Sequence, residues 1–305
     1  MTTPFDGITP LPHLGVIRAE GDDAVKFLHG QLTHDFALLD LQHARLTAFL
    51  SAKGRMQASF IGFKRSPTEV LLVCSRDLLA PTLKRMSMFV MRAKAKLSDA
   101  SEDVLLYGLA GNAIEKVAGS AIQTSAKADL GNISIIGLPP AGAVPRALWV
   151  APAGTPAPEG TPLPEGAWAW GEVQSGVATL TAPLVDAFVP QMLNYESVDG
   201  VSFKKGCYPG QEVVARSQFR GAIKRRAFLA HADGVLEAGA EVFSATEPEQ
   251  ACGVVAQTAP APGGGWDAIV VLQLSAAESG ALHTGSAVGP ALHLGTLPYA
   301  LKDDL

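Results

Sequence analysis

The sequence predicts an α+β protein of three units, with two α+β lobes followed by a small C-terminal β-barrel. Its 305 residues exceed the length of one average domain. Up to about residue 220, short strand patterns alternate with helical periodicity. After Arg226 that periodicity largely gives way to short apolar runs divided by glycines, which is typical of a small barrel or sandwich. We therefore place the units at residues 1–103, 104–219 and 220–305.

Composition and charge limit the classes of function. Hydrophobic residues make up 48% of the chain and charged residues 17%, which excludes a disordered protein. The net charge of −5 disfavours nucleic acid and anionic membranes, so we expect no direct nucleic-acid partner. Apolar runs such as 70–74 are far shorter than the ~20 residues of a membrane-spanning helix, and residues 1–10 lack a signal-peptide core. We expect a cytoplasmic protein that makes no membrane contact.

The first lobe reads as a strand, a helix and a meander of strands. A strand over 15–20 leads to a helix capped by residues 21–23, whose apolar positions recur at helical spacing: Ala24, Phe27, Leu28 and Leu32. Strands are predicted over 47–50, 57–63 and 69–74. A second helix is predicted over 78–90.

The second lobe repeats the mixture of strands and helices. Strands are predicted over 104–109, 133–138 and 147–151, with a helix over 113–117. The proline-rich and glycine-rich stretch 152–166 is predicted to be an exposed loop. Trp168 and Trp170 then alternate along a predicted strand, either filling the core or stacking on an aromatic ligand, and Glu172 and Gln174 follow on the same face.

The third unit is predicted to contain short strands over 227–230, 253–257, 269–274 and 291–294. Gly263 to Gly265 read as a flexible hairpin loop, because no helix with a lysine follows to make a phosphate cradle.

The segment 203–216 carries the clearest chemical signal. It reads as a loop that leads into a helix ending near Phe219. Cys207 then lies just before the helix N-terminus and beside Lys204 and Lys205, and both influences favour thiolate over thiol. A reactive nucleophile is one interpretation, and a small residue that fills a tight turn between Gly206 and Pro209 is the other.

The other cysteines and the histidines of the sequence do not indicate a metal site. Cys74 and Cys252 lie in apolar surroundings and are expected to be buried and inert. The three cysteines lie far apart without a C-x-x-C pair, which argues against a disulfide framework or a zinc site. His29, His34 and His43 match no recognised metal spacing.

The run from Lys205 to Arg216, K-G-C-Y-P-G-Q-E-V-V-A-R, resembles the signature of the YgfZ-type folate-binding proteins, relatives of the glycine-cleavage T-protein. Residues 27–35 resemble a second family landmark, F-L-x-G-Q-L-T-N-D, with His34 in place of the usual asparagine. Residues 52–55 and 188–194 also resemble family landmarks. The resemblance therefore covers nearly the whole chain.

This resemblance implies an aminomethyltransferase-like ring of three domains, with tetrahydrofolate or a one-carbon derivative in its central channel and the first lobe as the folate-binding lobe. It implies an accessory role in the assembly or repair of iron-sulfur proteins, including those that modify tRNA, with Cys207 as the reactive residue. The partners implied are folate and iron-sulfur proteins or their assembly factors. The candidate folate contacts are Lys205, Tyr208, Gln211, Glu212, Arg216, Gln191, Asn194, Trp170 and Gln174.

Two alternatives are open. A folate-dependent aminomethyl or one-carbon transferase needs a carboxylate for proton transfer near the folate nitrogen. The T-protein branch carries paired aspartates shortly after the glycine that corresponds to Gly54, whereas residues 55–59 of this chain are R-M-Q-A-S. Gln57 and Ala58 therefore disfavour transfer. The other alternative is a thiol carrier or interaction module that does not use folate.

Overall fold

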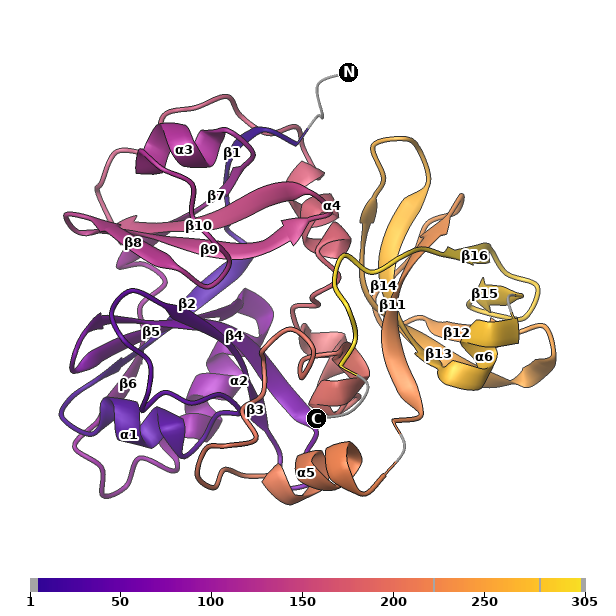
Figure 1. Cartoon of the computed structure of the whole chain (residues 1–305), viewed down its shortest axis with the longest axis horizontal. Coiled ribbons are helices and arrows are strands. Elements are labelled where there is room, and N and C mark those ends of the chain that lie inside the picture. The colour runs from indigo at the N-terminus through magenta and orange to yellow at the C-terminus, as the bar shows by residue number, and fades with distance from the viewer. Residues whose placement is uncertain (1–4, 222, 280, 303–305) are drawn as a thin grey trace.

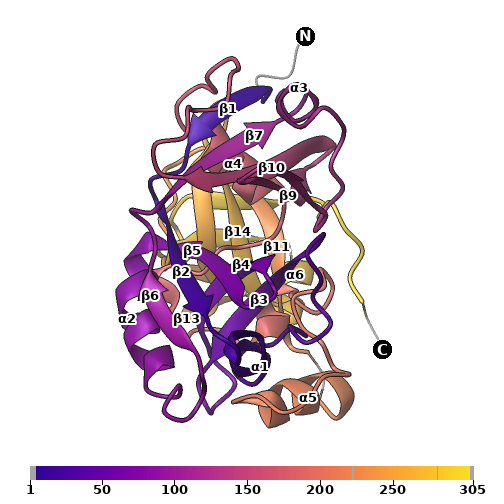
Figure 2. The ribbon, with the colours of Figure 1, turned by 90° about the vertical axis from the view of Figure 1, so that its left-hand side faces the viewer.

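The computed structural model describes residues 5–221, 223–279 and 281–302. Two antiparallel sheets lie one above the other, and a closed barrel stands beside them (Figure 1). Seen from the sheet side, the barrel lies behind both sheets (Figure 2). The α+β class and the C-terminal barrel expected from the sequence are confirmed. Among the described helices, none is long and apolar enough to cross a membrane.

The first lobe is a five-stranded sheet with two helices. Its strand order is β3-β4-β5-β2-β6. The strands are β2 (Leu14–Glu20), β3 (Ala44–Leu50), β4 (Met56–Ser66), β5 (Glu69–Ser75) and β6 (Lys96–Asp99), and the helices are α1 (Ala24–His29) and α2 (Arg76–Ser87). The first helix ends three residues before Leu32, which instead forms an isolated bridge to Phe49.

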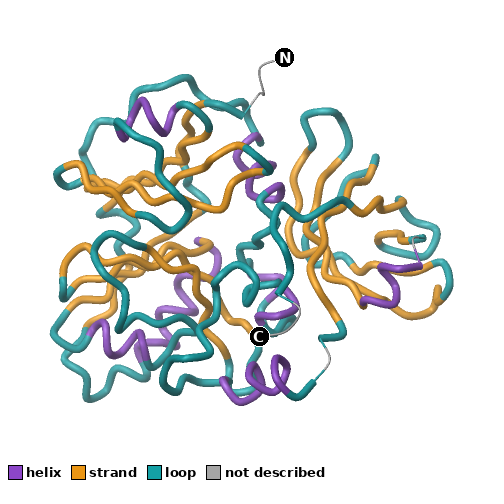
Figure 3. The backbone as a smooth tube through the Cα atoms, viewed as in Figure 1, coloured by secondary structure: helices purple, strands orange, loops and turns teal. Residues whose placement is uncertain are grey.

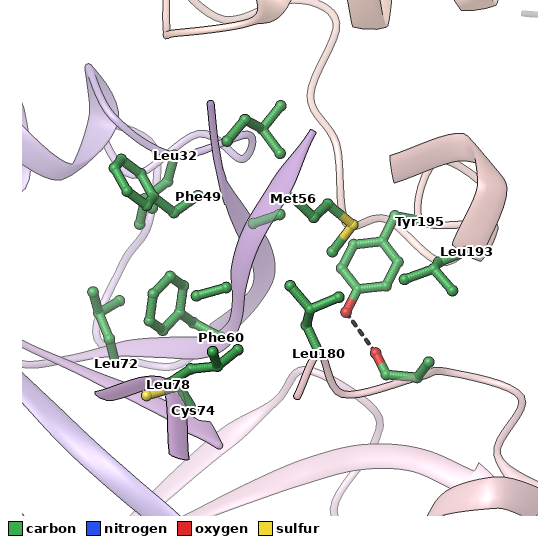
Figure 4. Packing of buried hydrophobic residues seen from close by; sticks show 14 of the residues in the cluster. Leu32, Phe49, Met56, Phe60, Leu72, Cys74, Leu78, Leu180, Leu193 and Tyr195 are labelled. Carbon is green, nitrogen blue, oxygen red and sulfur yellow. Dashed lines mark hydrogen bonds between the residues drawn. The ribbon is translucent and has the colours of Figure 1, made fainter. Parts of the chain in front are cut away.

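This sheet is buried on both faces because its strands alternate between two cores. Along β5, Val70, Leu72 and Cys74 enter the core beneath α1 and α2. The intervening Leu71 and Val73 enter a second core against the other sheet. Figure 4 shows the first of these cores, which continues through Met56 to Tyr195.

The second lobe is also a five-stranded sheet, of order β1-β7-β10-β9-β8. Its strands are β1 (Gly7–Pro10), β7 (Val104–Ala110), β8 (Lys127–Leu130), β9 (Ile133–Ala141) and β10 (Val144–Pro152), and α3 (Ala113–Ala118) follows β7. β1 pairs with β7, Gly7 lying opposite Ala110, so this sheet takes one strand from outside 104–219. We keep the three-unit division as our proposal, with β1 as a strand that crosses from the first unit.

Residues 167–174 form a helix, α4 (Ala167–Gln174), so the prediction of a strand there is wrong. Two tryptophans two residues apart imitate strand alternation. The buried positions Trp168 and Gly171 are three apart, which is helical spacing, and Gly166 supplies a left-handed residue at the N-terminus. Trp168 and Trp170 consequently point in different directions.

The barrel closes in the order β11-β14-β13-β12-β15-β16, with β16 pairing back to β11. Its elements are β11 (Arg225–Ala232), β12 (Glu241–Ser244), β13 (Glu247–Pro260), β14 (Trp266–Gln273), α6 (Leu274–Ser279), β15 (Leu282–Thr284) and β16 (Ala291–Leu294). The glycine run 263–265 joins β13 to β14 as the predicted hairpin loop.

A connecting segment, residues 175–210, lies at the centre of the molecule between the lobes and the barrel. It is mostly loop (Figure 3), interrupted by the 3₁₀ turns η1 (Ala182–Leu184) and η2 (Pro190–Leu193). The helix α5 (Gln211–Phe219) follows, with the bounds that the sequence predicts. Tyr195 is fully buried in this segment and donates its hydroxyl to the carbonyl oxygen of Ala178 at 2.7 Å (Figure 4).

The connecting segment is joined to the barrel by a buried ion pair. Arg226 of β11 donates Nη1–H to Glu196 Oε1 at 2.6 Å, and their side chains are 5% and 0% exposed. Asn194 extends this network, since its side-chain amide donates to the carbonyl of Ala227 at 2.9 Å and its oxygen accepts from the amide of Ala227 at 3.3 Å.

Replacing Arg226 by methionine should destabilise the protein by about 3–5 kcal/mol, because it leaves the Glu196 carboxylate buried without its cation. Denaturant unfolding measures the change. Arg216→Met is the matched control, since the Arg216–Glu212 pair is exposed and should cost under about 1 kcal/mol. Equal effects of the two variants would contradict a structural role for the buried pair.

Candidate functional site

A cavity lies between the two sheets and is closed on one side by α4 and the connecting segment. It encloses about 70 Å³ of space into which the centre of a water molecule fits, and about 650 Å³ of empty space when counted out to its open mouth. Apolar side chains from both sheets form most of the wall, and the polar lining groups are few: Ser59, Cys74, Arg146, Glu172, Thr179 and Tyr195.

Arg146 brings a cation into this cavity. The residue is 5% exposed, its Nε donates to the carbonyl of Pro139 at 3.0 Å, and its guanidinium lies 5.1 Å from the ring centre of Trp168. Its Nη1 has no hydrogen-bond partner among the described residues. Burial lowers the pKa of Arg146 to about 10, and the charge of Glu172 acts in the opposite direction. A buried donor without a partner is costly, so this nitrogen fits an acceptor on a ligand.

Glu172 brings an anion to the same cavity. Trp168 Nε1 donates to its Oε1 at 3.1 Å, and Gln257 of the barrel donates to its Oε2 at 3.3 Å. Nε2 of the half-exposed His13 lies 3.7 Å from Glu172 Oε1. A hydrogen bond to Glu172 raises the pKa of His13, although burial acts against it. The carboxylate is thus oriented by three units of the fold.

Cys207 lies elsewhere, on the loop that precedes α5, and α5 itself lies at the lower edge of the molecule in Figure 1. It is exposed, whereas Cys74 and Cys252 are buried as expected. The loop and the 51–55 turn meet through two glycines of positive φ, Gly54 and Gly210. A Cβ on Gly210 would lie 2.7 Å from the Cα of Gly54, so only glycine permits this approach.

Lys205 fixes the Cys207 loop to the first lobe. Its Nζ donates to the main-chain oxygen of His29 and, at 2.6 Å, to that of Leu32. The same nitrogen lies 4.6 Å from the ring centre of the buried Tyr208. Burial lowers the pKa of Lys205 to about 8, while Asp35 and Cys207 oppose the change. Lys205 therefore anchors the loop through backbone oxygens of the first lobe.

Four further predicted folate contacts, Gln191, Asn194, Glu212 and Arg216, have partners within the protein, but Gln191 Oε1 is buried with none among the described residues. Gln191 donates to the carbonyl of Val214 in α5 at 2.8 Å, and Asn194 binds the backbone of β11. Glu212 and Arg216 pair with each other on the exposed face of α5. Gln211, at the start of α5, is partly buried.

The two predicted contacts on α4 face the barrel. Trp170 Nε1 and Gln174 Nε2 both donate to Asp267 Oδ2, at 2.7 and 2.8 Å. Asp267 also contacts His231 Nδ1 at 2.7 Å.

The described wall of the central cavity contains none of the nine predicted contacts and does not contain Cys207. The structure instead places Lys205, Cys207 and Tyr208 in the loop before α5, Gln211 at the start of that helix, and Trp170 with Gln174 against the barrel. Sequence reasoning considered Trp168 as a stacking residue and noted Glu172 on the same predicted face, but chose neither as a contact, and it did not single out Arg146. A lone arginine within the apolar strand 144–152 was the signal that could have found Arg146.

Within the described ranges, no three His, Cys, Asp or Glu side chains gather closely enough to hold a metal ion.

No family model matches the chain. Among curated relatives, the tRNA-modifying protein YgfZ of Colwellia psychrerythraea is 31% identical over 232 residues, covering 72% of this chain and 69% of the relative. The protein of the same name from Photobacterium profundum is 32% identical over 230 residues, covering 70% and 67%. The chain belongs to the YgfZ family. A third YgfZ, from Cronobacter sakazakii, extends the similarity to 93% of this chain and 90% of its own length, at 29% identity.

The fold of this YgfZ-family chain is similar to that of a solved aminomethyltransferase. The aminomethyltransferase T of the glycine cleavage system from Bartonella henselae superposes with a TM-score of 0.67, covering 98% of this chain and 88% of that one at 14% identity. The aminomethyltransferase-like fold expected from the resemblance is confirmed.

The pair formed by His13 and Glu172 predicts a specific titration. The pKa of His13 is raised in the folded state, so its ion pair with Glu172 stabilises the fold when the pH is below the ordinary histidine pKa of about 6.5. This stabilisation is lost as the pH rises through the pKa that His13 has in the folded protein. NMR titration should place the midpoint of His13 above its ordinary value of about 6.5. Glu172→Gln should return it toward the ordinary value, and an unchanged midpoint would contradict the pairing.

Proposed function

We propose that the chain binds a reduced folate, tetrahydrofolate or a one-carbon derivative, in the central cavity. We propose further that it supports the assembly or repair of iron-sulfur proteins through Cys207, and thereby tRNA modification. The name of its YgfZ relatives, tRNA-modifying protein, supports the last of these roles. One observation carries the ligand proposal: the same cavity contains Arg146 Nη1, a donor without a hydrogen-bond partner among the described residues, and the Glu172 carboxylate.

The chemistry of the cavity suits the pterin ring of a folate. A pterin presents N–H donors on its pyrimidine edge beside a carbonyl acceptor, so its recognition needs one acceptor and one donor on the protein. Glu172 provides the acceptor and Arg146 Nη1 the donor. The apolar remainder of the wall, which includes Trp168 and Leu148, fits the flat ring body.

Folate-dependent transfer is the less supported function for this cavity. Gln57 occupies the stretch after Gly54 and donates to Asp186 Oδ1 at 2.6 Å, and Ala58 beside it is buried in the core. Residues 55–59 accordingly provide no carboxylate for proton transfer. Binding without aminomethyl transfer is the function we favour.

Tetrahydrofolate should bind with a dissociation constant near 1 μM, roughly −8 kcal/mol, in isothermal titration. Glu172→Gln should weaken binding about tenfold or more, because it replaces a charged acceptor by an amide. Glu102→Gln, which changes an exposed carboxylate paired with Arg76 in the same way, is the matched control and should bind like the wild type. No binding by the wild type at millimolar ligand would rule out the folate proposal and favour a thiol carrier.

Cys207 should be the thiol that alkylates fastest, because burial raises the pKa of Cys74 to about 12 and also raises that of Cys252. Iodoacetamide labelling followed by mass spectrometry measures the three rates. Cys207→Ala should change the unfolding free energy by less than about 1 kcal/mol, since the side chain is exposed, yet abolish complementation of an iron-sulfur enzyme defect. Full complementation by this variant would reject the proposed role of the thiol.

A further inference from the structure

The Cys207 loop lies against the side chain of His29, the last residue of α1. Lys205 holds the loop there by hydrogen bonds to main-chain oxygens at the end of that helix. The imidazole Nε2 of His29 lies 3.5 Å from the position that a Cβ on Gly206 would occupy. The ring therefore faces the backbone of the residue that immediately precedes Cys207.

Asp35 holds the opposite edge of this imidazole. His29 Nδ1 lies 3.2 Å from Asp35 Oδ1, and the two side chains are only 22% and 15% exposed. Burial alone would raise the pKa of Asp35, but the amides of Leu38 and Ala37 and the charges of His29 and Lys205 lower it. Asp35 is thus an ionised acceptor for a proton on Nδ1. The backbone N–H of Ala37 points at Nδ1, at 3.4 Å, and also at the Asp35 carboxylate, and with a proton on Nδ1 it donates to the carboxylate.

With a proton on Nδ1, the lone pair of a neutral His29 is on Nε2, directed to the Cys207 loop. The charged groups that face this site are Asp35 from the loop after α1, and Lys205 and Cys207 from the loop before α5. The other two histidines nearby in sequence are engaged elsewhere, His34 with Asp199 at 3.3 Å and His43 with Asp40 at 2.8 Å.

We propose that His29 accepts the proton of the Cys207 thiol, and that Asp35 is the positioning residue that orients His29 for this step. Cys207 is exposed and directly follows Gly206, which His29 Nε2 approaches, so the proposed step requires the Cys207 side chain to turn toward that nitrogen. The inference rests on the proposed function only in taking Cys207 as the working thiol. His29 occupies the variable position of the F-L-x-G-Q landmark, so the pair is a feature of this chain and not of the signature.

The proton transfer balances without a further reactant. The S–H bond of Cys207 breaks as an N–H bond forms at His29 Nε2, which leaves a thiolate beside an imidazolium that the Asp35 carboxylate stabilises. The thiolate electron pair then forms the new bond to an electrophile. With iodoacetamide this is an S–C bond, the C–I bond breaks, iodide leaves with its electrons, and His29 later releases the proton to water.

The test is the pH profile of Cys207 carbamidomethylation, from pH 5 to 10, followed by mass spectrometry on the full-length protein. His29→Gln should label about tenfold more slowly at pH 7 and converge with the wild type near pH 10, where the thiolate forms without a base. Asp35→Asn should shift the profile in the same direction by a smaller amount. His43→Gln removes a histidine that is also paired with an aspartate in the same lobe, and it should leave the profile unchanged.

A His29→Gln profile equal to that of His43→Gln would overturn the inference. So would slowing by the same factor at every pH, since loss of access or local structure does not depend on the protonation of Cys207. The Lys205 anchor uses main-chain oxygens, so His29→Gln leaves it in place. If His29→Gln shifts the profile but Cys207→Ala still complements, the proposed cellular role fails while the proton-transfer pair stands.

Discussion

The structure depends on satisfying the backbone of a buried segment that is neither helix nor sheet. Residues 175–210 run between both sheets and the barrel, where water cannot hydrogen-bond to most of their polar groups. Asn194 solves part of this problem, because a left-handed backbone lets its side chain bond the edge of β11 through both its amide and its oxygen. Arg226 and Glu196 complete the junction. These contacts connect residues 194–196 to β11, although Glu196 Oε2 is buried without a hydrogen-bond partner among the described residues.

The central cavity and the Cys207 loop are separate places joined by that same segment. Ala178, Thr179 and Tyr195 line the cavity, and Gln191, only four residues before Tyr195, donates to the carbonyl of Val214 in α5. A ligand that orders the cavity wall would therefore act on the anchor of the helix that follows Cys207. Under the function proposed above, folate would bind within the scaffold, whereas the exposed thiol of Cys207 would meet a protein client at the surface.

Sequence reasoning succeeded where the signal was local and failed where it depended on tertiary contact. The loop and helix around Cys207 follow from Pro209 and the glycines beside it, and the structure reproduces the bounds of α5. The sequence could not show that Arg146 lies beside Trp168 and Glu172, because these residues are over 20 positions apart and meet only across the cavity. The prediction of a strand over the residues of α4 was wrong because two tryptophans in eight residues are too few to distinguish the two-residue period of a strand from the 3.6-residue period of a helix.

The pairing of β1 with β7 has a consequence for synthesis on the ribosome. β1 is made before any strand of the first sheet, but its neighbour β7 ends at Ala110, about a hundred residues later. Translation at 5–20 residues per second makes this a wait of roughly 5–20 seconds, long compared with the time in which a single lobe folds. During that interval strands β2 to β5 can pair while β1 extends from them unpaired. The nascent chain thus carries an unpaired strand with which a neighbouring chain can pair.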